Sequence, residues 1–239
     1  MKETSCFSNM KSYYKLCAGL AIVMVVYSIF TIIIVGVFGA QPQSAVEAFT
    51  MLQDNYWIGI LQLDILTLFI MPLYYIFIIA FYVTMKPSGS IYLVVGALLG
   101  LCGNTLWLAT PSVFSWVALF KTYQATTDAI TQSQLISAGE VLLASDMWHG
   151  SGAQLGGILL QTSMVIISVL MLKNSSFGRW TAWSGIIVNG VDLLHILFGF
   201  FAPTIGSTIF FIAGPLYFVW YPLLARDFLQ LAKMPANIL

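Results

Sequence analysis

Long apolar stretches separated by short polar connections make up most of the chain. The stretches do not alternate apolar and polar residues along their length, so each predicts a helix rather than a strand of a membrane barrel. A helix needs about 20 apolar residues to cross the hydrocarbon layer of a membrane. Six stretches meet this requirement: Leu16–Phe38, Trp57–Met85, Ile91–Thr110, Gly152–Leu172, Trp180–Phe201 and Thr204–Phe228. We therefore predict an all-α protein with one integral membrane domain over residues 1–239 and six transmembrane helices.

Two connections are long enough to carry structure of their own. The first, residues 40–56, predicts a short interfacial helix around Ala45–Leu52. The second, residues 111–151, is the largest segment outside the predicted spans and is mostly compatible with a helix. Its helical spacing predicts a buried side made of Ile130, Leu135, Ile136, Val141 and Leu142. One interpretation of this segment is an amphipathic cap over one end of the bundle, between the third and fourth spans. The other is a loop packed beside the bundle.

Glycines recur at helical spacing in the third and fourth spans. Small residues allow the backbones of two membrane helices to approach closely. The third and fourth spans are therefore predicted to pack tightly through Gly96, Gly100, Gly103, Gly152 and Gly156.

Composition places these helices in a membrane. Of the 239 residues, 59% are hydrophobic and only 8% are charged, whereas soluble domains carry about 25% charged residues. So few charges cannot cover the surface of a soluble protein of this size. The formal net charge is zero and no basic patch stands out, so the sequence predicts the lipid bilayer as a partner and no binding to nucleic acid.

Basic residues distinguish the two sides of the predicted bundle. Six spans place both termini on one side, and the other side carries Lys121 alone. Because connections rich in lysine and arginine stay in the cytoplasm, we predict a multi-pass plasma-membrane protein with both termini cytoplasmic. The basic residues on the side of the termini are Lys2, Lys11, Lys15, Lys86, Lys173, Arg179, Arg226 and Lys233.

Polar side chains interrupt four of the spans at a similar depth. Counted from the end of each span that faces away from the termini, they lie roughly six to nine residues inside. These residues are Asp64, Asn104, Gln161, Asp192 and His195. The fifth span adds Asn189, which lies on the same helical face as Asp192 and His195 because the three are spaced i, i+3 and i+6. We predict that these six side chains form a ligand-binding pocket within the membrane.

A buried hydrogen-bond network that only fixes helix packing is the structural alternative for this pocket. Hydrogen bonds between membrane helices contribute about 0.6 kcal/mol on average. Inserting an aspartate at the centre of a membrane helix costs about 2.5–3.5 kcal/mol. Packing alone is therefore a weak reason for two aspartates, and the sequence favours a functional role.

The best interpretation of this pocket is binding or sensing of a small ligand, a proton or a metal ion. A divalent metal is the cofactor that these side chains suggest, with Asp64, Asp192 and His195 as its candidate ligands and His149 as a further one. The sequence identifies no catalytic residue and no substrate. Three alternatives stay open: a transporter or permease, an intramembrane metal-dependent enzyme acting on an apolar substrate, and a purely structural role.

Two segments carry a family resemblance. In PLYYIFIIAFYVTMKPSGSIYLVVGALLGLCGN, from Pro72 to Asn104, an aromatic-rich span ends in Met-Lys-Pro and a tight turn leads into a glycine-rich span. In LMLKNSSFGRWTAWSGIIVNG, from Leu170 to Gly190, a short basic turn with Arg-Trp joins two spans. With six spans in a chain of this length, the sequence resembles a family of bacterial and archaeal six-helix membrane proteins classed as a domain of unknown function. That family usually has proline before Arg-Trp, where this chain has Gly178. The resemblance implies a six-helix architecture and no particular activity.

Overall fold

A computed structural model describes residues 2–147 and 149–234, and over this part of the chain all regular structure is helical. Six of its segments are long and apolar enough to cross a membrane: Met10–Phe38, Tyr56–Ser88, Ile91–Ala125, Ser151–Met171, Arg179–Phe201 and Pro203–Lys233. The prediction of an all-α protein with six apolar spans is thereby confirmed. In chain order the helices are α1 (Lys2–Phe38), α2 (Ala45–Asp54), α3 (Tyr56–Gln62), α4 (Ile65–Met85), a 3-10 turn (Lys86–Ser88), α5 (Ile91–Leu108), α6 (Val113–Ala125), α7 (Ala129–Ala144), α8 (Ser151–Met171), α9 (Arg179–Phe201) and α10 (Pro203–Lys233).

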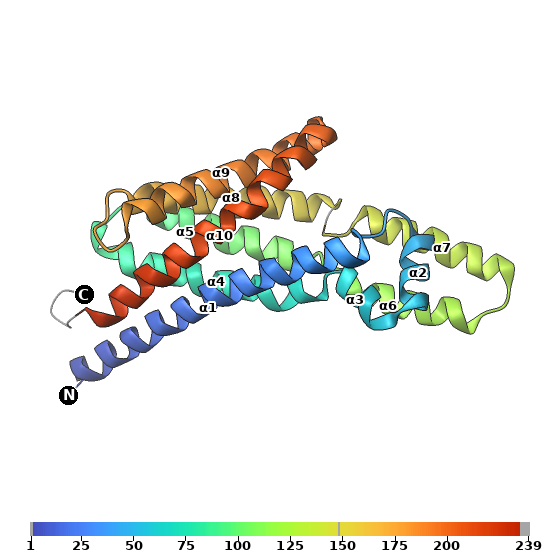
Figure 1. Cartoon of the computed structure of the whole chain (residues 1–239), viewed down its shortest axis with the longest axis horizontal. Coiled ribbons are helices and arrows are strands. Elements are labelled where there is room, and N and C mark those ends of the chain that lie inside the picture. The colour runs from blue at the N-terminus through green and yellow to red at the C-terminus, as the bar shows by residue number, and fades with distance from the viewer. Residues whose placement is uncertain (1, 148, 235–239) are drawn as a thin grey trace.

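The six long helices form a closed ring of neighbours. In the order α1, α4, α5, α8, α9 and α10, each helix contacts the next, and α10 closes the ring against α1. The start of α1 and the end of α10 lie at the same end of the molecule, which we call the terminal end (Figure 1). The opposite, distal end carries α2, α3, α6 and α7, and there the hairpin of α9 and α10 diverges from the other long helices (Figure 1).

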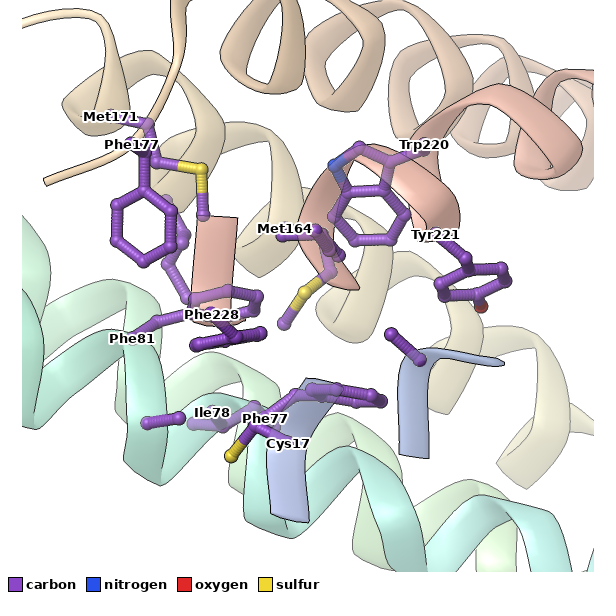
Figure 2. Close-up of a cluster of buried hydrophobic side chains, with 14 of the residues drawn as sticks. Cys17, Phe77, Ile78, Phe81, Met164, Met171, Phe177, Trp220, Tyr221 and Phe228 are labelled. Carbon is purple, nitrogen blue, oxygen red and sulfur yellow. The ribbon is translucent and has the colours of Figure 1, made fainter. Parts of the chain in front are cut away.

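Aromatic side chains fill the bundle near the terminal end. Phe228 of α10 lies at the centre of this core. Its ring centroid is 5.8–6.3 Å from the centroids of four other rings, those of Tyr14, Phe77, Phe81 and Phe177. Figure 2 shows the rings of Phe77, Phe81, Phe177 and Phe228 together with the side chains of Met164 and Met171 from the same core. Offset and edge-to-face contacts at such distances add stability beyond the burial of apolar area. The centre of this half of the bundle is therefore densely packed with apolar groups.

Glycines bring α5 and α8 into backbone contact, as their spacing predicts. A Cβ atom added to Gly103 would lie 2.7 Å from the carbonyl oxygen of Gly156, and one added to Gly156 would lie 2.8 Å from the carbonyl oxygen of Gly103. Ser163 of α8 also donates a hydrogen bond to the carbonyl of Gly96, at 2.6 Å. The two helices thus fix one edge of the ring at close range.

The distal helices have a hydrophobic core of their own. Phe49 of α2 and Trp116 of α6 pack edge to face, with ring centroids 5.9 Å apart. The predicted helix around Ala45–Leu52 is confirmed as α2, and Glu140 of α7 accepts a hydrogen bond from the first backbone N–H of α2 at 2.8 Å. A carboxylate is well placed there because the N-terminus of a helix carries partial positive charge.

The buried side predicted for residues 130–142 is wrong at two positions. Ile130 and Val141 are both 70% exposed, whereas Gly139 and Leu143 are buried. The reason is steric: Gly139, which has no side chain, lies against Ala45 and the ring of Trp116, and this contact sets the face that α7 turns inward. In the structure α6 and α7 pack on each other and on α2.

The second apolar span is two helices instead of the continuous one that its composition predicts. Helix α3 ends at Gln62 and α4 begins at Ile65. Between them Asp64 adopts a left-handed conformation, with φ 61° and ψ 42°. Within the apolar stretch the chain therefore changes direction at a carboxylate.

Candidate ligand-binding site

Asp192 of α9 is the centre of a three-residue polar site. The Gln161 amide of α8 donates a hydrogen bond to Asp192 Oδ2 at 2.5 Å, and the Tyr217 hydroxyl of α10 donates to the same oxygen at 2.9 Å. The Gln161 amide nitrogen also donates to the Tyr217 hydroxyl oxygen at 3.2 Å. Three neighbouring helices of the ring thus meet at one carboxylate oxygen.

Local sequence explains why these side chains meet. Gly157 lies one turn before Gln161 on α8, and a Cβ atom at this glycine would lie 2.8 Å from the Ile196 side chain of α9. The missing side chain leaves room for Ile196 at the contact of α8 with α9, one turn from the hydrogen bond between Gln161 and Asp192. The short α9–α10 connection then places Tyr217 on the other side of the carboxylate, because two helices joined by a tight turn run antiparallel.

Tyrosine hydroxyls extend the polar site toward α4. The ring of Tyr217 stacks on that of Tyr221, with centroids 5.3 Å apart. The Tyr221 hydroxyl hydrogen-bonds with the Tyr74 hydroxyl of α4 at 2.6 Å. Two hydrogen bonds and one ring contact therefore link Asp192 of α9 to Tyr74 of α4, at the boundary of the aromatic core.

These tyrosines are functional candidates that the sequence analysis missed. Tyrosine in a membrane protein is often an interface anchor, and its hydroxyl attracts less notice than a carboxylate. Tyr217, however, lies near the middle of α10, whereas tyrosines that anchor a helix at the membrane interface lie near its ends. It also lies one turn from Tyr221, so that both rings share one face of the helix. The position of Tyr217 in the middle of an apolar span, one turn from a second tyrosine, was the sequence feature that could have identified it.

Two other predicted residues of α9 bond elsewhere. The Asn189 side chain donates to the carbonyl of Gly185, one turn back in its own helix, at 2.7 Å. His195 Nδ1 lies 3.0 Å from the carbonyl oxygen of Gly206 in α10, and its ring packs against Phe210. Both lie within one turn of Asp192 along the helix without bonding to it, and His195 instead ties the distal parts of α9 and α10 together.

The remaining predicted residues lie on other interfaces of the ring. Asn104 of α5 is fully buried and donates to the carbonyl of Met71 in α4 at 3.0 Å, next to Pro72. Asp64 lies at the break between α3 and α4 and faces Tyr27 of α1 and Thr67. The structure therefore brings Gln161 and Asp192 together and separates Asp64 and Asn104 from them.

Within the described residues, no three His, Cys, Asp or Glu side chains come together as a group that could hold a metal ion. His149 pairs with Asp146, with 3.0 Å between Nδ1 and Oδ1, outside the Asp192 site. The Asp192 site itself offers one carboxylate, one amide and one hydroxyl.

Another buried carboxylate, Asp227 of α10, holds the terminal end together. It accepts hydrogen bonds from the Gly178 backbone N–H at 2.7 Å and from the Thr181 hydroxyl at 2.5 Å, both at the start of α9. The Arg226 guanidinium donates a hydrogen bond to the other carboxylate oxygen of Asp227, Oδ1, at 2.8 Å. The charge of Asp227 is thus balanced by Arg226, and its hydrogen bonds join α10 to the start of α9.

Asp192 forms no ion pair in the described part of the chain, where the ion pairs are those of Asp146 and Asp227, and the basic group that acts on it electrostatically is His195, one turn along α9. Both hydrogen bonds to its carboxylate reach Oδ2, and the residue is only partly buried. Its second oxygen is free of a hydrogen bond from the described residues. Such a carboxylate can take up a proton, or can accept hydrogen bonds from a cationic or hydroxyl-bearing ligand.

Comparison with known proteins finds no match to this chain among family models, curated proteins or solved structures. The class of the protein therefore follows from its fold: a helical bundle whose six apolar segments fit a multi-pass membrane protein.

Proposed function

We propose that this chain is a binding or sensing protein that takes up a proton, or another small cationic ligand, at Asp192. The observation that supports this proposal is the single carboxylate held by Tyr217 and Gln161 through one oxygen, without an ion pair to a lysine or arginine in the described part of the chain. Two neutral donors position the carboxylate, and the other oxygen is left for the ligand. Binding of a positive charge would neutralise the site.

Energetics favour a role beyond packing. An aspartate in the membrane costs about 2.5–3.5 kcal/mol on insertion scales. The two hydrogen bonds to Asp192 return about 0.6 kcal/mol each on average. The difference is a reason to expect a ligand, since intramembrane carboxylates that are not offset by packing usually mark ion or substrate sites.

The membrane orientation follows from the charge distribution. We propose a plasma-membrane location with both termini in the cytoplasm, because Lys121 is the only basic residue assigned to the distal side by the sequence. The segment formed by α6 and α7 would then lie outside the cell. In this orientation Asp192, past the middle of α9 from its start, belongs to the outer half of the membrane, and the ligand would enter from outside.

Infrared difference spectroscopy tests the proposal for the proton. A protonated carboxyl group has a carbonyl stretching band that an ionised one lacks. A pH step applied to the purified protein should change this band, the change should be absent from the Asp192→Asn variant, and it should persist in Asp64→Asn as a matched control. An unchanged response in Asp192→Asn would exclude Asp192 as the proton-binding group. Native mass spectrometry of the same proteins would then identify any other bound species.

Transport is the second candidate, and one observation favours it. Further along the same three helices, toward the terminal end, Ser168 of α8, Thr181 of α9 and Trp220 of α10 are all buried. Their polar groups offer contacts between Asp192 and the terminal end. Proteoliposomes that acidify internally under a pH gradient with the wild-type protein, and not with Asp192→Asn, would support proton transport over binding alone.

A further inference from the structure

The break in the second apolar span surrounds a buried carboxylate of its own. Asp64 is 6% exposed and is the one non-glycine residue with positive φ in the described part of the chain. Residues other than glycine seldom adopt this conformation, although aspartate and asparagine tolerate it better than most. Strained backbone of this kind is concentrated at binding sites, where the surrounding structure holds it in place.

Oxygen atoms surround this carboxylate. The Asp64 carboxylate lies near Tyr27 and Thr67, and its side chain makes no capping hydrogen bond to the start of α4. The two hydroxyls, Tyr27 from α1 and Thr67 from α4, are 2.7 Å apart. Asp64 also lines a small cavity of about 10 Å³ with Thr31, Gln62 and neighbouring apolar residues. A cavity of this size holds about one water-sized particle.

The break also leaves a backbone oxygen available. The N–H of Thr67 donates to the carbonyl of Asp64, at 3.1 Å, and that of Asp64 donates to the carbonyl of Leu61, also at 3.1 Å. In a continuous helix Thr67 would instead donate to Leu63. As a result the Leu63 carbonyl receives no backbone hydrogen bond within the described residues. Unwound carbonyls at interrupted membrane helices can coordinate cations, but Leu63 lines a second small cavity and not the one that Asp64 lines.

We propose that Asp64 forms a cation-binding site at the break between α3 and α4, and that its ligand is a small monovalent cation of the size of sodium. The donors near Asp64 are oxygen atoms, namely its own carboxylate and the hydroxyls of Tyr27, Thr31 and Thr67, and hard cations prefer such donors. One carboxylate and no basic neighbour in an ion pair give the site a single negative charge, which one monovalent cation neutralises. A divalent ion would leave an uncompensated charge inside the membrane. This site lies between α1 and α4 and is independent of the site at Asp192.

Thermal unfolding of the purified protein in sodium chloride, potassium chloride and choline chloride at equal ionic strength tests this proposal. Sodium is expected to raise the unfolding temperature in a saturable manner, and choline is expected to have no such effect. The Asp64→Asn and Asp64→Gly variants should lose the sodium response. Both replacements tolerate the left-handed backbone, so they remove the charge while keeping the fold. Asp192→Asn should keep the full sodium response, so failure of one site is distinguishable from failure of the other.

A second measurement decides the matter if the Asp64 variants do not fold. Binding of radioactive sodium to the wild type and to Thr67→Ala should show saturable binding in the wild type, with the concentration for half-saturation raised about tenfold in the variant. Such a tenfold change corresponds to about 1.4 kcal/mol of binding free energy. An equal response to sodium and choline, no saturable sodium binding by the wild type, or a sodium response that survives in folded Asp64→Asn would each overturn the proposal. A pH-dependent infrared band assigned to Asp64, without any sodium effect, would make the proton its ligand and would likewise overturn it.

Discussion

Individual hydroxyl and carboxylate groups give the Asp192 site its properties, and Tyr217 is the most informative residue to change. Tyr217→Phe removes one of the two hydrogen bonds to Asp192 Oδ2 and keeps the ring that stacks on Tyr221. Loss of this bond should cost only about 0.6 kcal/mol of stability. The carbonyl band of the protonated Asp192 carboxyl should nevertheless shift in the infrared spectrum, because its hydrogen bonding has changed.

Tyr75→Phe is the matched control for this change. The Tyr75 hydroxyl bonds with Thr105, at 2.8 Å, and does not contact Asp192. The control should lose a similar, small amount of stability without any shift of the carboxyl band. Equal spectra for Tyr217→Phe and the wild type would show that the Tyr217 hydroxyl does not bond to the carboxyl in the membrane.

Outside the spans, Asp128 is the residue whose protonation has a foreseeable effect. It caps α7 by accepting hydrogen bonds from the Thr131 hydroxyl at 2.6 Å and the Thr131 backbone N–H at 2.9 Å. These bonds hold the pKa of Asp128 below its ordinary value. Because the pKa is lowered in the folded state, the cap is complete above the pKa of an unfolded aspartate and is lost as the pH falls through the lowered value.

Hydrogen exchange at the first turn of α7 measures this effect. The Thr131 amide should exchange more rapidly as the pH is lowered through this range, after correction for intrinsic exchange, and in Asp128→Ala it should exchange rapidly at every pH. Asp128→Asn should keep part of the protection, since asparagine is also a good N-cap. Slow exchange in Asp128→Ala would mean that the cap does not hold this turn.

Among the helices, the contact between α5 and α8 is the closest and should be the most sensitive. A Cβ atom at Gly103 would lie 2.5 Å from the backbone nitrogen of Leu160. Because backbone atoms cannot move aside as a flexible side chain can, Gly103→Ala should destabilise the protein by about 1–3 kcal/mol, as overpacking usually does. Unfolding of the purified protein by denaturant in mixed micelles would measure the loss.

Gly190→Ala provides the control for the same substitution in another helix. Nothing lies within 4 Å of a Cβ atom added at Gly190 of α9. Alanine there should be neutral or should stabilise by up to about 1 kcal/mol, because glycine is a poor helix former. Similar stabilities of the two variants would contradict the close packing of α5 on α8.

Helix positions were largely predictable from the sequence, whereas the break at Asp64 was not. Apolar runs of sufficient length identified all six segments, since the membrane requires continuous helical hydrogen bonding. The run from Trp57 to Met85 contains Asp64, but a single polar residue within it gives no indication of a left-handed backbone. Of the residues near Asp64, Thr67 is local, whereas Tyr27 of α1 is brought there by tertiary structure.

At the scale of the whole molecule, counting residues along the helices predicts the depth of a side chain and gives no information on which neighbouring helix it faces. Counting residues from the helix ends placed Asp64 and Asp192 in one layer, but a residue in a ring of helices can face either neighbour. Asp64 faces α1, whereas Asp192 lies between α8 and α10. The order of helices around the ring depends on packing contacts such as those of Gly103 and Gly157, which involve residues far apart in the sequence. For this reason the six predicted residues of one pocket lie on several interfaces.

Orientation in the membrane is the property of the whole molecule that the charge distribution predicts. Lys121, in α6 at the distal end, and Lys173, in the turn between α8 and α9 at the terminal end, are both exposed. In a background without the native cysteines, Lys121→Cys should react with a membrane-impermeant maleimide in intact cells. Lys173→Cys should react only after permeabilisation. The reason is the positive-inside bias, by which the side of the protein richer in lysine and arginine stays in the cytoplasm. Eight of the nine basic residues, all except Lys121, belong to the terminal side.

Each result of this labelling experiment has a definite structural meaning. The expected pattern would place the Asp192 site in the outer half of the membrane, where an extracellular ligand has the shorter path. The reverse pattern would place the termini outside and turn the same site toward the cytoplasm, so that its ligand would come from within the cell. Reaction of both variants in intact cells would contradict the arrangement in which Lys121 and Lys173 lie at opposite ends of the bundle (Figure 1). Removal of one further lysine from the terminal side, as in Lys86→Gln, should leave the pattern unchanged, because the remaining basic residues still outnumber Lys121.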